Sequence, residues 1–164
     1  MTFYKIVKTK TMKIKYIKAK LSNIEDMQKL ILPEVENGVI LERTEDEIAT
    51  NIRSYMLAYK KDKLVGFNAL HIHTSTLAEI RSLVVSQKER GQKIGQELIK
   101  KALEEASVLG IKRVLSLTYK QSFFECLGFV EIPKESLPEH KIWADCIKCK
   151  HFPICNEVSL IKSI

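Results

Sequence analysis

The stretch from Glu79 to Gly110 constrains the fold of this chain more than any other. Residues Glu79 to Val85 end in Leu-Val-Val, which is typical of a strand. From Lys93 to Leu109 apolar residues recur three and four positions apart, which predicts a helix, and Gly110 suits a C-terminal cap. The basic, glycine-bearing segment Arg90–Gly95 joins the two. A strand, a turn and a helix in this order predict an α/β fold.

The turn between this strand and this helix is a candidate anion site. Unpaired N–H groups at a helix start, together with the helix dipole, favour a phosphate or a pyrophosphate. Glycines before helices are also common in plain strand–helix connections, so the turn alone leaves both interpretations open. The residues concerned are Arg90, Gly91, Gln92, Lys93, Ile94, Gly95 and Gln96.

Length and composition predict a single domain. A chain of 164 residues forms one well-packed α/β domain but not two ordinary ones. We expect this domain to span residues 12–164, with residues 1–11 as an N-terminal extension and Met12 as a candidate initiator. No apolar run reaches the roughly 18 residues of a membrane span, and the basic N-terminus lacks the apolar core of a secretory signal. We therefore expect a cytoplasmic protein.

The net charge of +7 allows two interpretations. A basic chain can bind nucleic acid, but these lysines are scattered and no RNA- or DNA-binding motif accompanies them. A solvated, lysine-rich surface is therefore favoured. A positive field also attracts a polyanionic cofactor and an acidic substrate. We expect a small-molecule partner and neither nucleic acid nor membrane, and a homodimer is compatible with the sequence.

The remaining elements alternate along the chain. Capping boxes at Ser22–Glu25 and Thr44–Glu47 predict two helix starts. The first helix is expected to end near Leu32, with a loop from Pro33 to Leu41. Apolar alternation predicts strands at residues 13–18, 55–59, 64–72, 77–85, 113–118, 128–132 and 157–161. The predicted order is β-α-α-β-β-β-α-β-α-β-β.

This order and the turn together resemble the GNAT superfamily of N-acetyltransferases. The pattern V-x-x-x-x-R-G-x-x-I-G, from Val85 to Gly95, is similar to that superfamily's acyl-CoA-binding motif, Q/R-x-x-G-x-G/A. Lys93 stands where the middle glycine is usual. The resemblance covers the element order from end to end. It implies a GNAT fold: a mixed, mostly antiparallel central sheet flanked by helices, with a splayed cleft for acetyl-CoA.

The resemblance assigns cofactor contacts to the end of the central strand. The Leu83 N–H would meet the thioester carbonyl and stabilise the developing oxyanion. Val84 belongs to the same segment, and the Val85 backbone would pair with the pantetheine arm like an added strand. Residues 90–96 would hold the pyrophosphate.

A second segment, Ser122–Phe129, resembles the motif Y-x-x-x-G-F of the same superfamily. Phe124 occupies the place where a tyrosine commonly protonates the departing thiolate. Phenylalanine cannot donate a proton, so the role is absent or falls to Tyr119, Ser122 or water. Phe124 remains a candidate cofactor contact, and both phenylalanines also suit the core.

Glu79 begins the central strand, and similar enzymes carry a general base at this position. An amine must lose a proton before it attacks, and partial burial would raise the pKa of the carboxyl group. A surface carboxylate is the alternative. Strand alternation places Glu79, Arg81 and Leu83 on one face. Arg81 would then either bind a substrate carboxylate or pair with Glu79 or another acid.

A narrower resemblance points to stand-alone acetyltransferase domains of N-acetylglutamate synthases. Residues 38–44, 78–85 and 123–129 carry it. It implies L-glutamate as the acceptor in arginine biosynthesis, with Arg43 and Arg81 flanking the cleft from different sides, one for each carboxylate. The alternatives are another small amine, a peptide or protein N-terminus, or a non-catalytic acyl-CoA-binding module. Lys93 and Phe124 favour the last, and Glu79 opposes it.

The C-terminal segment, residues 140–156, is rich in cysteine. Cys146, Cys149 and Cys155 follow C-x2-C-x5-C spacing, with His151 among them and His140 before them. Three cysteines and a histidine form a tetrahedral zinc set, so a structural zinc is one interpretation. Three reduced, partly buried thiols are the other.

Overall fold

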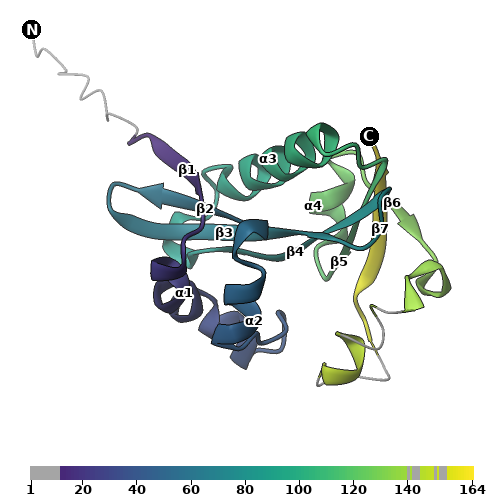
Figure 1. Ribbon diagram of the computed structural model, residues 1–164, viewed down its shortest axis with the longest axis horizontal. Coiled ribbons are helices and arrows are strands. Elements are labelled where there is room, and N and C mark those ends of the chain that lie inside the picture. Colours follow the sequence, from purple (N-terminus) through teal and green to yellow (C-terminus); the bar gives the residue numbers. More distant parts are fainter. Residues whose placement is uncertain (1–11, 140, 142–144, 150, 152–154) are drawn as a thin grey trace, which may run out of the picture.

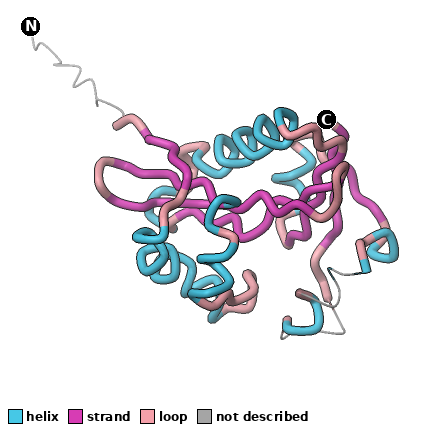
Figure 2. Tube along the Cα trace, viewed as in Figure 1, coloured by secondary structure: helices cyan, strands magenta, loops and turns pink. Residues whose placement is uncertain are grey.

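A seven-stranded sheet crosses the molecule and has helices on both of its faces (Figures 1 and 2). The computed structural model describes residues 12–139, 141, 145–149, 151 and 155–164. The expected extension at residues 1–11 lies outside the described residues, as does His140. Among the described residues, no helix is long and apolar enough to cross a membrane.

The elements follow one another in the order that the sequence predicts. The strands are β1 (Ile14–Lys18), β2 (Tyr55–Lys60), β3 (Lys63–Ile72), β4 (Leu77–Val85), β5 (Arg113–Thr118), β6 (Val130–Ile132) and β7 (Val158–Ser163). The helices are α1 (Ile24–Glu36), α2 (Glu45–Thr50), α3 (Ile94–Val108) and α4 (Gln121–Glu125). The predicted mixed α/β fold is confirmed.

The cleft that the family resemblance implies lies where β4 separates from β5. The strand order is β1-β2-β3-β4-β5-β7-β6, and among the strands of the described residues only β4 and β5 are parallel neighbours. Their ladder covers Leu77–Glu79 on β4 and Arg113–Leu115 on β5, and the described residues form no further pair beyond it. Two parallel strands that part in this way open the sheet toward their carboxyl ends. Glu79 lies where the separation begins.

Two apolar layers hold the helices on the sheet. On one face α1 and α2 bury Ile24, Met27 and Ile48 against the strand residues Tyr55, Leu57, Phe67, Ala69 and Val84. On the other face α3 and α4 bury Ile99, Ala102, Ala106 and Phe124 against Leu70, Ile80, Val114 and Leu160. Burial of this apolar surface is the main favourable term in folding. It fixes the two halves of the sheet around the cleft.

A β-bulge interrupts β4 in the middle of its length. Phe67 pairs with Val84, and two residues further on Ala69 pairs with Arg81. Two residues of β4, Ser82 and Leu83, therefore lie opposite one residue of β3. Ser82 accommodates the extra residue with a φ of +55°, in the left-handed region.

The bulge overturns one prediction about faces. Leu83 packs against the layer that contains Ile80, on the side of α3. Val84 packs in the layer of α1 and α2. Simple alternation, which puts Leu83 on the face of Glu79 and Arg81, is therefore wrong, because one inserted residue reverses the pleat.

Helix α1 is longer than the sequence predicts. It runs through Pro33 to Glu36. Proline lacks an N–H donor, but its carbonyl still accepts the N–H of Asn37 at 3.1 Å, and its ring is exposed. Gly38, with a φ of +71°, follows the helix end, where a left-handed residue is favourable.

The two predicted capping boxes have different outcomes. At Thr44 the box is confirmed: the Glu47 N–H donates to Thr44 Oγ1 at 3.2 Å, and the Thr44 N–H donates to the Glu47 carboxylate at 2.8 Å. The box at Ser22 is wrong, because a 3₁₀ turn precedes α1 and Asn23 Oδ1 accepts the Lys20 N–H instead. The confirmed box fixes the chain directly after Arg43.

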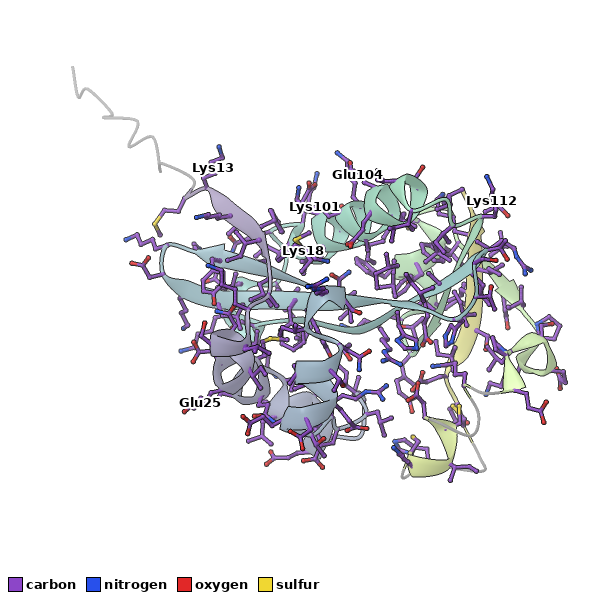
Figure 3. The ribbon with its side chains drawn as sticks, in the orientation of Figure 1. Lys13, Lys18, Glu25, Lys101, Glu104 and Lys112 are labelled. Atoms are coloured by element: carbon purple, nitrogen blue, oxygen red, sulfur yellow. The ribbon has the colours of Figure 1, made fainter. Side chains whose placement is uncertain are left out.

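Charged side chains cover the outside of the molecule. Lys13, Glu25, Glu104 and Lys112 project from separate parts of the surface (Figure 3). Several lysines pair with acids nearby, as Lys18 does with Glu105 at 3.0 Å. This arrangement agrees with a solvated surface of mixed charge.

The contact between β3 and β4 gives a test of this packing. A Cβ added at Gly66 would lie 2.9 Å from the Val84 carbonyl oxygen, which is too close for the backbone to remain in place. We expect Gly66→Ala to lower the free energy of unfolding by about 1–3 kcal/mol, as other overpacked sites do. Thermal unfolding measures the change.

The matched control is Gly95→Ala in α3, where the nearest atoms to an added Cβ lie 3.4 and 3.7 Å away. That variant should melt within about 2 °C of the wild type. Equal melting temperatures for Gly66→Ala and the wild type would contradict the close approach of the two strands.

Candidate active site

A cleft of about 1030 Å³ opens where β4 and β5 part. The end of β4, the turn before α3 and helix α4 line one part of it, and Arg43, Glu79, Arg81, Lys141 and Asp145 line another. Most of the predicted site residues lie on its wall. They are Arg43, Glu79, Arg81, Leu83, Val84, Val85, Arg90, Gly91, Lys93, Ile94, Gly95, Gln96, Tyr119, Phe124, Cys146, Cys149 and Cys155.

The end of β4 offers backbone groups to this cleft. Neither Ser82 nor Leu83 has a partner in the ladder with β3 among the described residues. On the β5 side the ladder has already ended at Glu79. A backbone segment outside its sheet ladder is suited to pair with an extended ligand. This is the arrangement that the predicted roles of Leu83 and Val85 require.

The turn before α3 keeps a left-handed conformation without the usual glycine. Lys93, the residue before the first turn of α3, has a φ of +62°, and Gly91 has a φ of +80°. A lysine in this region is sterically strained compared with glycine. Lys93, which stands in place of the motif's middle glycine, therefore preserves the left-handed backbone of the turn and adds a cation to it.

Two side chains of the turn have partners within the protein. Arg90 donates from Nε to the Val85 carbonyl at 3.2 Å and from Nη2 to Glu34 at 2.8 Å. Gln92 donates to Glu89 at 2.8 Å and does not line the cleft. Arg90 thus ties the turn to β4 and α1, while Gln92 points elsewhere.

Aromatic residues close the cleft beside α4. Phe124 is buried and packs edge-on against Phe123 and Phe129, at centroid distances of 5.5 and 5.2 Å. Tyr119 lines the cleft and is exposed. Burial, followed by the charge of Glu157, raises the pKa of the Tyr119 phenol. This phenol therefore stays protonated at neutral pH, as a proton donor must.

Glu79 lies at the apex of the cleft and is almost fully enclosed. Its side chain is 2% exposed, with Oε2 2.7 Å from His73 Nε2 and Oε1 accepting a hydrogen bond from Lys141 Nζ at 2.5 Å. Burial alone would raise the pKa of Glu79, but the contacts with His73 and Lys141 outweigh burial and lower it. The predicted rise in this pKa is therefore wrong. Glu79 is a carboxylate at neutral pH.

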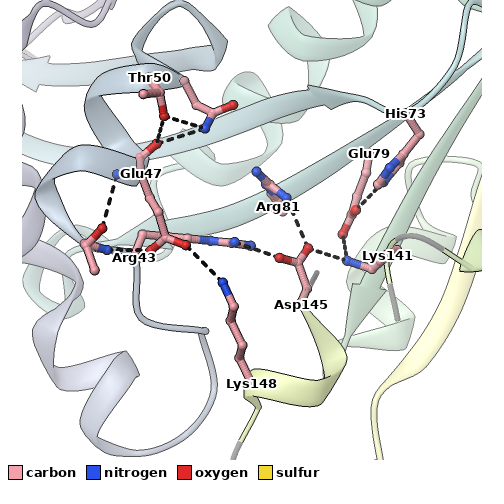
Figure 4. A network of polar contacts seen from close by, with 11 residues as sticks. Arg43, Glu47, Thr50, His73, Glu79, Arg81, Lys141, Asp145 and Lys148 are labelled. Carbon is pink, nitrogen blue, oxygen red and sulfur yellow. Dashed lines mark hydrogen bonds and ion pairs between the residues drawn. The ribbon is translucent and has the colours of Figure 1, made fainter. Parts of the chain in front are cut away.

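The two predicted substrate arginines converge on one carboxylate (Figure 4). Arg43 Nη1 donates to Asp145 Oδ1 at 2.7 Å, and Arg81 Nη1 donates to Asp145 Oδ2 at 3.1 Å. In the free protein both arginines therefore contact the same carboxylate rather than one carboxylate each, and the acid that pairs with Arg81 is Asp145 rather than Glu79. Lys141 Nζ lies 3.4 Å from Asp145 Oδ2 and joins both carboxylates in one network.

Burial and mutual charge govern the ionisation of these groups. Burial would raise the pKa of Asp145, but the hydrogen bond from Arg43 and the charge of Lys141 lower it far more. Burial and the neighbouring Arg43 lower the pKa of Arg81. Burial also opposes the charge on Arg43, but Asp145 outweighs it and raises that pKa. Asp145 is what makes two adjacent guanidinium groups tolerable here.

Sequence reasoning missed His73, Lys141 and Asp145. His73 follows β3 and contacts Glu79 across the β3–β4 hairpin. The sequence alone does not reveal this contact. Lys141 and Asp145 are four residues apart, and the Asp145 N–H donates to the Lys141 carbonyl at 2.8 Å. That spacing was a usable signal for a one-turn pair. The cysteines of the same segment drew the interpretation toward zinc instead.

The predicted zinc set is not assembled. Among the described residues, no group of three His, Cys, Asp or Glu side chains could hold a metal ion. His151 Nε2 instead lies 2.9 Å from the Gly38 carbonyl oxygen, and its ring packs edge-on against Tyr119. Cys146, Cys149 and Cys155 are free thiols, and burial raises the pKa of Cys146.

Sequence comparison identifies relatives for most of the chain. The family model of the acetyltransferase (GNAT) family matches residues 22–129. An uncharacterised N-acetyltransferase of Chlorobaculum tepidum is 34% identical over 89% of this chain and 94% of its own length. An amino-acid acetyltransferase of Mycobacterium tuberculosis is 30% identical over 70% of this chain and 67% of its own length.

Structural comparison supports the same fold. N-acetylglutamate synthase of Neisseria gonorrhoeae, solved with coenzyme A and N-acetyl-glutamate, superposes with a TM-score of 0.82 at 23% identity. The match covers 92% of this chain but only 35% of the gonococcal enzyme.

The strained lysine of the turn yields a paired test. Lys93→Gly should relieve the left-handed strain and also remove a cation from the cleft wall, so we expect weaker acetyl-CoA binding, by roughly five- to tenfold. Lys61→Gly is the control, because Lys61 has a φ of +55° in the β2–β3 turn, away from the cleft lining. Calorimetric titration measures both affinities.

Both variants should melt no lower than the wild type. If Lys93→Gly binds acetyl-CoA as tightly as Lys61→Gly does, the lysine side chain contributes nothing to the cofactor and only its backbone matters.

Proposed function

Since this chain belongs to the acetyltransferase (GNAT) family, we propose that it transfers the acetyl group of acetyl-CoA to the α-amino group of L-glutamate. The observation that carries the proposal is the convergence of Arg43 and Arg81 on a single carboxylate in the same cleft as Glu79. Two buried guanidinium groups aimed at one point are suited to recognise a carboxylate. An acceptor amine without a carboxylate would leave both arginines unused.

The names and ligands of related proteins support this acceptor. Relatives of this chain are named amino-acid acetyltransferases, and the gonococcal synthase was solved with coenzyme A and N-acetyl-glutamate. On this basis acetyl-CoA would lie along β4. The Val85 backbone would pair with its pantetheine arm, and residues 90–96 would lie at its pyrophosphate. Four free cysteines agree with a reducing, cytoplasmic setting, where we place the reaction as a step of arginine biosynthesis.

The proposed reaction is a direct transfer. The acceptor's ammonium group gives a proton to the Glu79 carboxylate, directly or through one water molecule. The freed lone pair attacks the thioester carbon, and the Leu83 N–H stabilises the oxygen as it becomes negative. When the carbonyl re-forms, the carbon–sulfur bond breaks and coenzyme A leaves as a thiolate, while the new amide nitrogen loses its second proton to solvent. Tyr119, whose pKa is raised, or solvent returns a proton to that sulfur.

The partners of Glu79 explain how a buried carboxylate can serve as a base. Lys141 and His73 each hold one carboxylate oxygen, which fixes the direction of the proton-accepting lone pairs. The lowered pKa makes Glu79 a weak base, but it keeps the whole population in the charged form at neutral pH. Position rather than basicity would therefore supply the catalytic effect.

The role of Glu79 predicts both a rate and a pH profile. We expect Glu79→Gln to lower kcat by roughly 10²-fold while the Kd for acetyl-CoA stays within twofold. Because the pKa of Glu79 lies below its usual value, its proton-accepting form is lost only as pH falls through that lowered pKa. Wild-type kcat should therefore show no acidic limb from Glu79 above about pH 5.

Thiol release measured across pH tests both points, and Glu105→Gln on the outside of α3 serves as a control that should keep the wild-type rate. Unchanged turnover in Glu79→Gln at pH 7 would remove Glu79 from the mechanism.

The arginines predict the choice of acceptor. Lysine cannot reproduce the planar fork of a guanidinium group, so we expect Arg43→Lys and Arg81→Lys each to raise the KM for L-glutamate about tenfold. The KM for acetyl-CoA should barely change. Arg53→Lys, at an exposed position beside α2, is the matched control. A wild-type preference for an uncharged amine over L-glutamate, in a panel of amino acids and polyamines, would rule out the proposed acceptor.

A further inference from the structure

The place where we propose that the acceptor's carboxylate binds is occupied by a side chain of the protein itself, Asp145. It comes from the C-terminal segment, far in sequence from Arg43 and Arg81, yet its side chain is only 9% exposed and lies between their guanidinium groups. Each of its two oxygens receives one arginine, at 2.7 and 3.1 Å. A carboxylate held in this way has the chemistry that we propose for the acceptor's own carboxylate, in the place where the acceptor would bind.

The arginines are not saturated by Asp145. Each donates a single Nη1 to it, and the Nε of both Arg43 and Arg81 is buried without a hydrogen-bond partner among the described residues. An unpaired buried donor is costly, and a guanidinium group binds a carboxylate best through two parallel hydrogen bonds. Two arginines that each keep a spare buried donor indicate a subsite built for more than the single aspartate that now fills it.

The charges of the network show what removing Asp145 would require. Three cations, Arg43, Arg81 and Lys141, face two carboxylates, Asp145 and Glu79. If Asp145 left the arginines, three largely buried cations would face one carboxylate, which is unfavourable because each uncompensated charge has lost its hydration. An incoming carboxylate restores the original balance. A neutral or cationic amine does not.

We propose that Asp145 is a specificity-determining residue: its carboxylate occupies the subsite of the acceptor's carboxylate, which the acceptor must displace in order to bind. This inference rests on the proposed function and deepens it. An acceptor that carries a carboxylate exchanges one anion for another between Arg43 and Arg81. Amines without a carboxylate cannot make this exchange, so the internal aspartate excludes them.

The first experiment measures binding without catalysis. Glutarate has two carboxylates and no amine, so it can occupy the subsite without reacting. Thermal unfolding of the full chain is followed at increasing glutarate concentration for the wild type, Asp145→Ala and Asp145→Asn. We expect both variants to be stabilised at glutarate concentrations at least tenfold lower than the wild type requires.

Two further variants define the site. In Asp145→Ala combined with Arg43→Ala, the tenfold gain should disappear, because one of the two arginines that would hold glutarate is gone. Asp62→Ala, at an exposed turn between β2 and β3, should respond to glutarate as the wild type does. If Asp145→Ala is unfolded without an anion, recovery of a cooperative transition with glutarate supports the proposal, and failure to recover counts against it.

The glutarate titration can also contradict the proposal. If Asp145 is a fixed counter-ion for the arginines, its loss disorders them, and glutarate stabilises neither Asp145 variant at lower concentration than the wild type. That outcome overturns the proposal. It leaves the proposed acetylation of L-glutamate to be judged separately by the thiol-release panel.

A kinetic measurement separates this inference from the proposed function. In Asp145→Asn the KM for L-glutamate should fall about fivefold or more, while the KM for acetyl-CoA stays constant. A raised KM for L-glutamate would contradict displacement. If neither protein acetylates L-glutamate, the proposed function fails, but the glutarate titration still decides the role of Asp145.

Discussion

The structure depends on the separation of β4 from β5 immediately after Glu79. Up to that residue the two strands share a ladder, and beyond it their backbones are released from each other. The separation makes room for a cleft, and it leaves the Ser82–Val85 end of β4 without a partner on that side. The bulge at Ser82 and Leu83 releases part of the same segment from β3 as well. A backbone freed on both sides is what an extended cofactor arm needs.

The proposed acceptor end of the cleft is organised by charge. Glu79, Lys141, Asp145 and the two arginines form one buried network, and each member depends on a neighbour of opposite sign. The network joins β4, the loop before α2 and the C-terminal segment, which are distant in sequence (Figure 4). Because Lys141 contacts both carboxylates, a change at Asp145 also alters the surroundings of Glu79. The proposed carboxylate site and the candidate base are therefore electrostatically coupled.

Local signals predicted the fold well, because hydrophobic periodicity and helix caps are encoded by neighbouring residues. The bounds of β4 and β5, the order of elements and the capping box at Thr44 all follow from such patterns. The turn at Lys93 was also recognisable.

The predictions that failed depend on contacts that neighbouring residues do not encode. The bulge at Ser82 inserts one residue without a sequence signature, and it reverses the face of Leu83. The pairing of Asp145 with Arg43 spans a sequence separation that no periodicity reports. The lowered pKa of Glu79 depends on Lys141 and His73, which only the tertiary fold brings near.

The buried network is better explained by binding than by stability. Taking several charges out of water costs free energy, and well-packed apolar side chains of similar volume are often as stable or more so. A network kept for stability alone would also satisfy its donors, yet Arg43 and Arg81 each keep a buried Nε without a partner in the described part of the chain. Unsatisfied donors of this kind carry a penalty in the free protein that a ligand can remove. The cost is then repaid when a carboxylate binds, so the arrangement favours the liganded state over the free one. The same reasoning explains why a single aspartate suffices in the free protein: it limits the repulsion between the two guanidinium groups without completing the site.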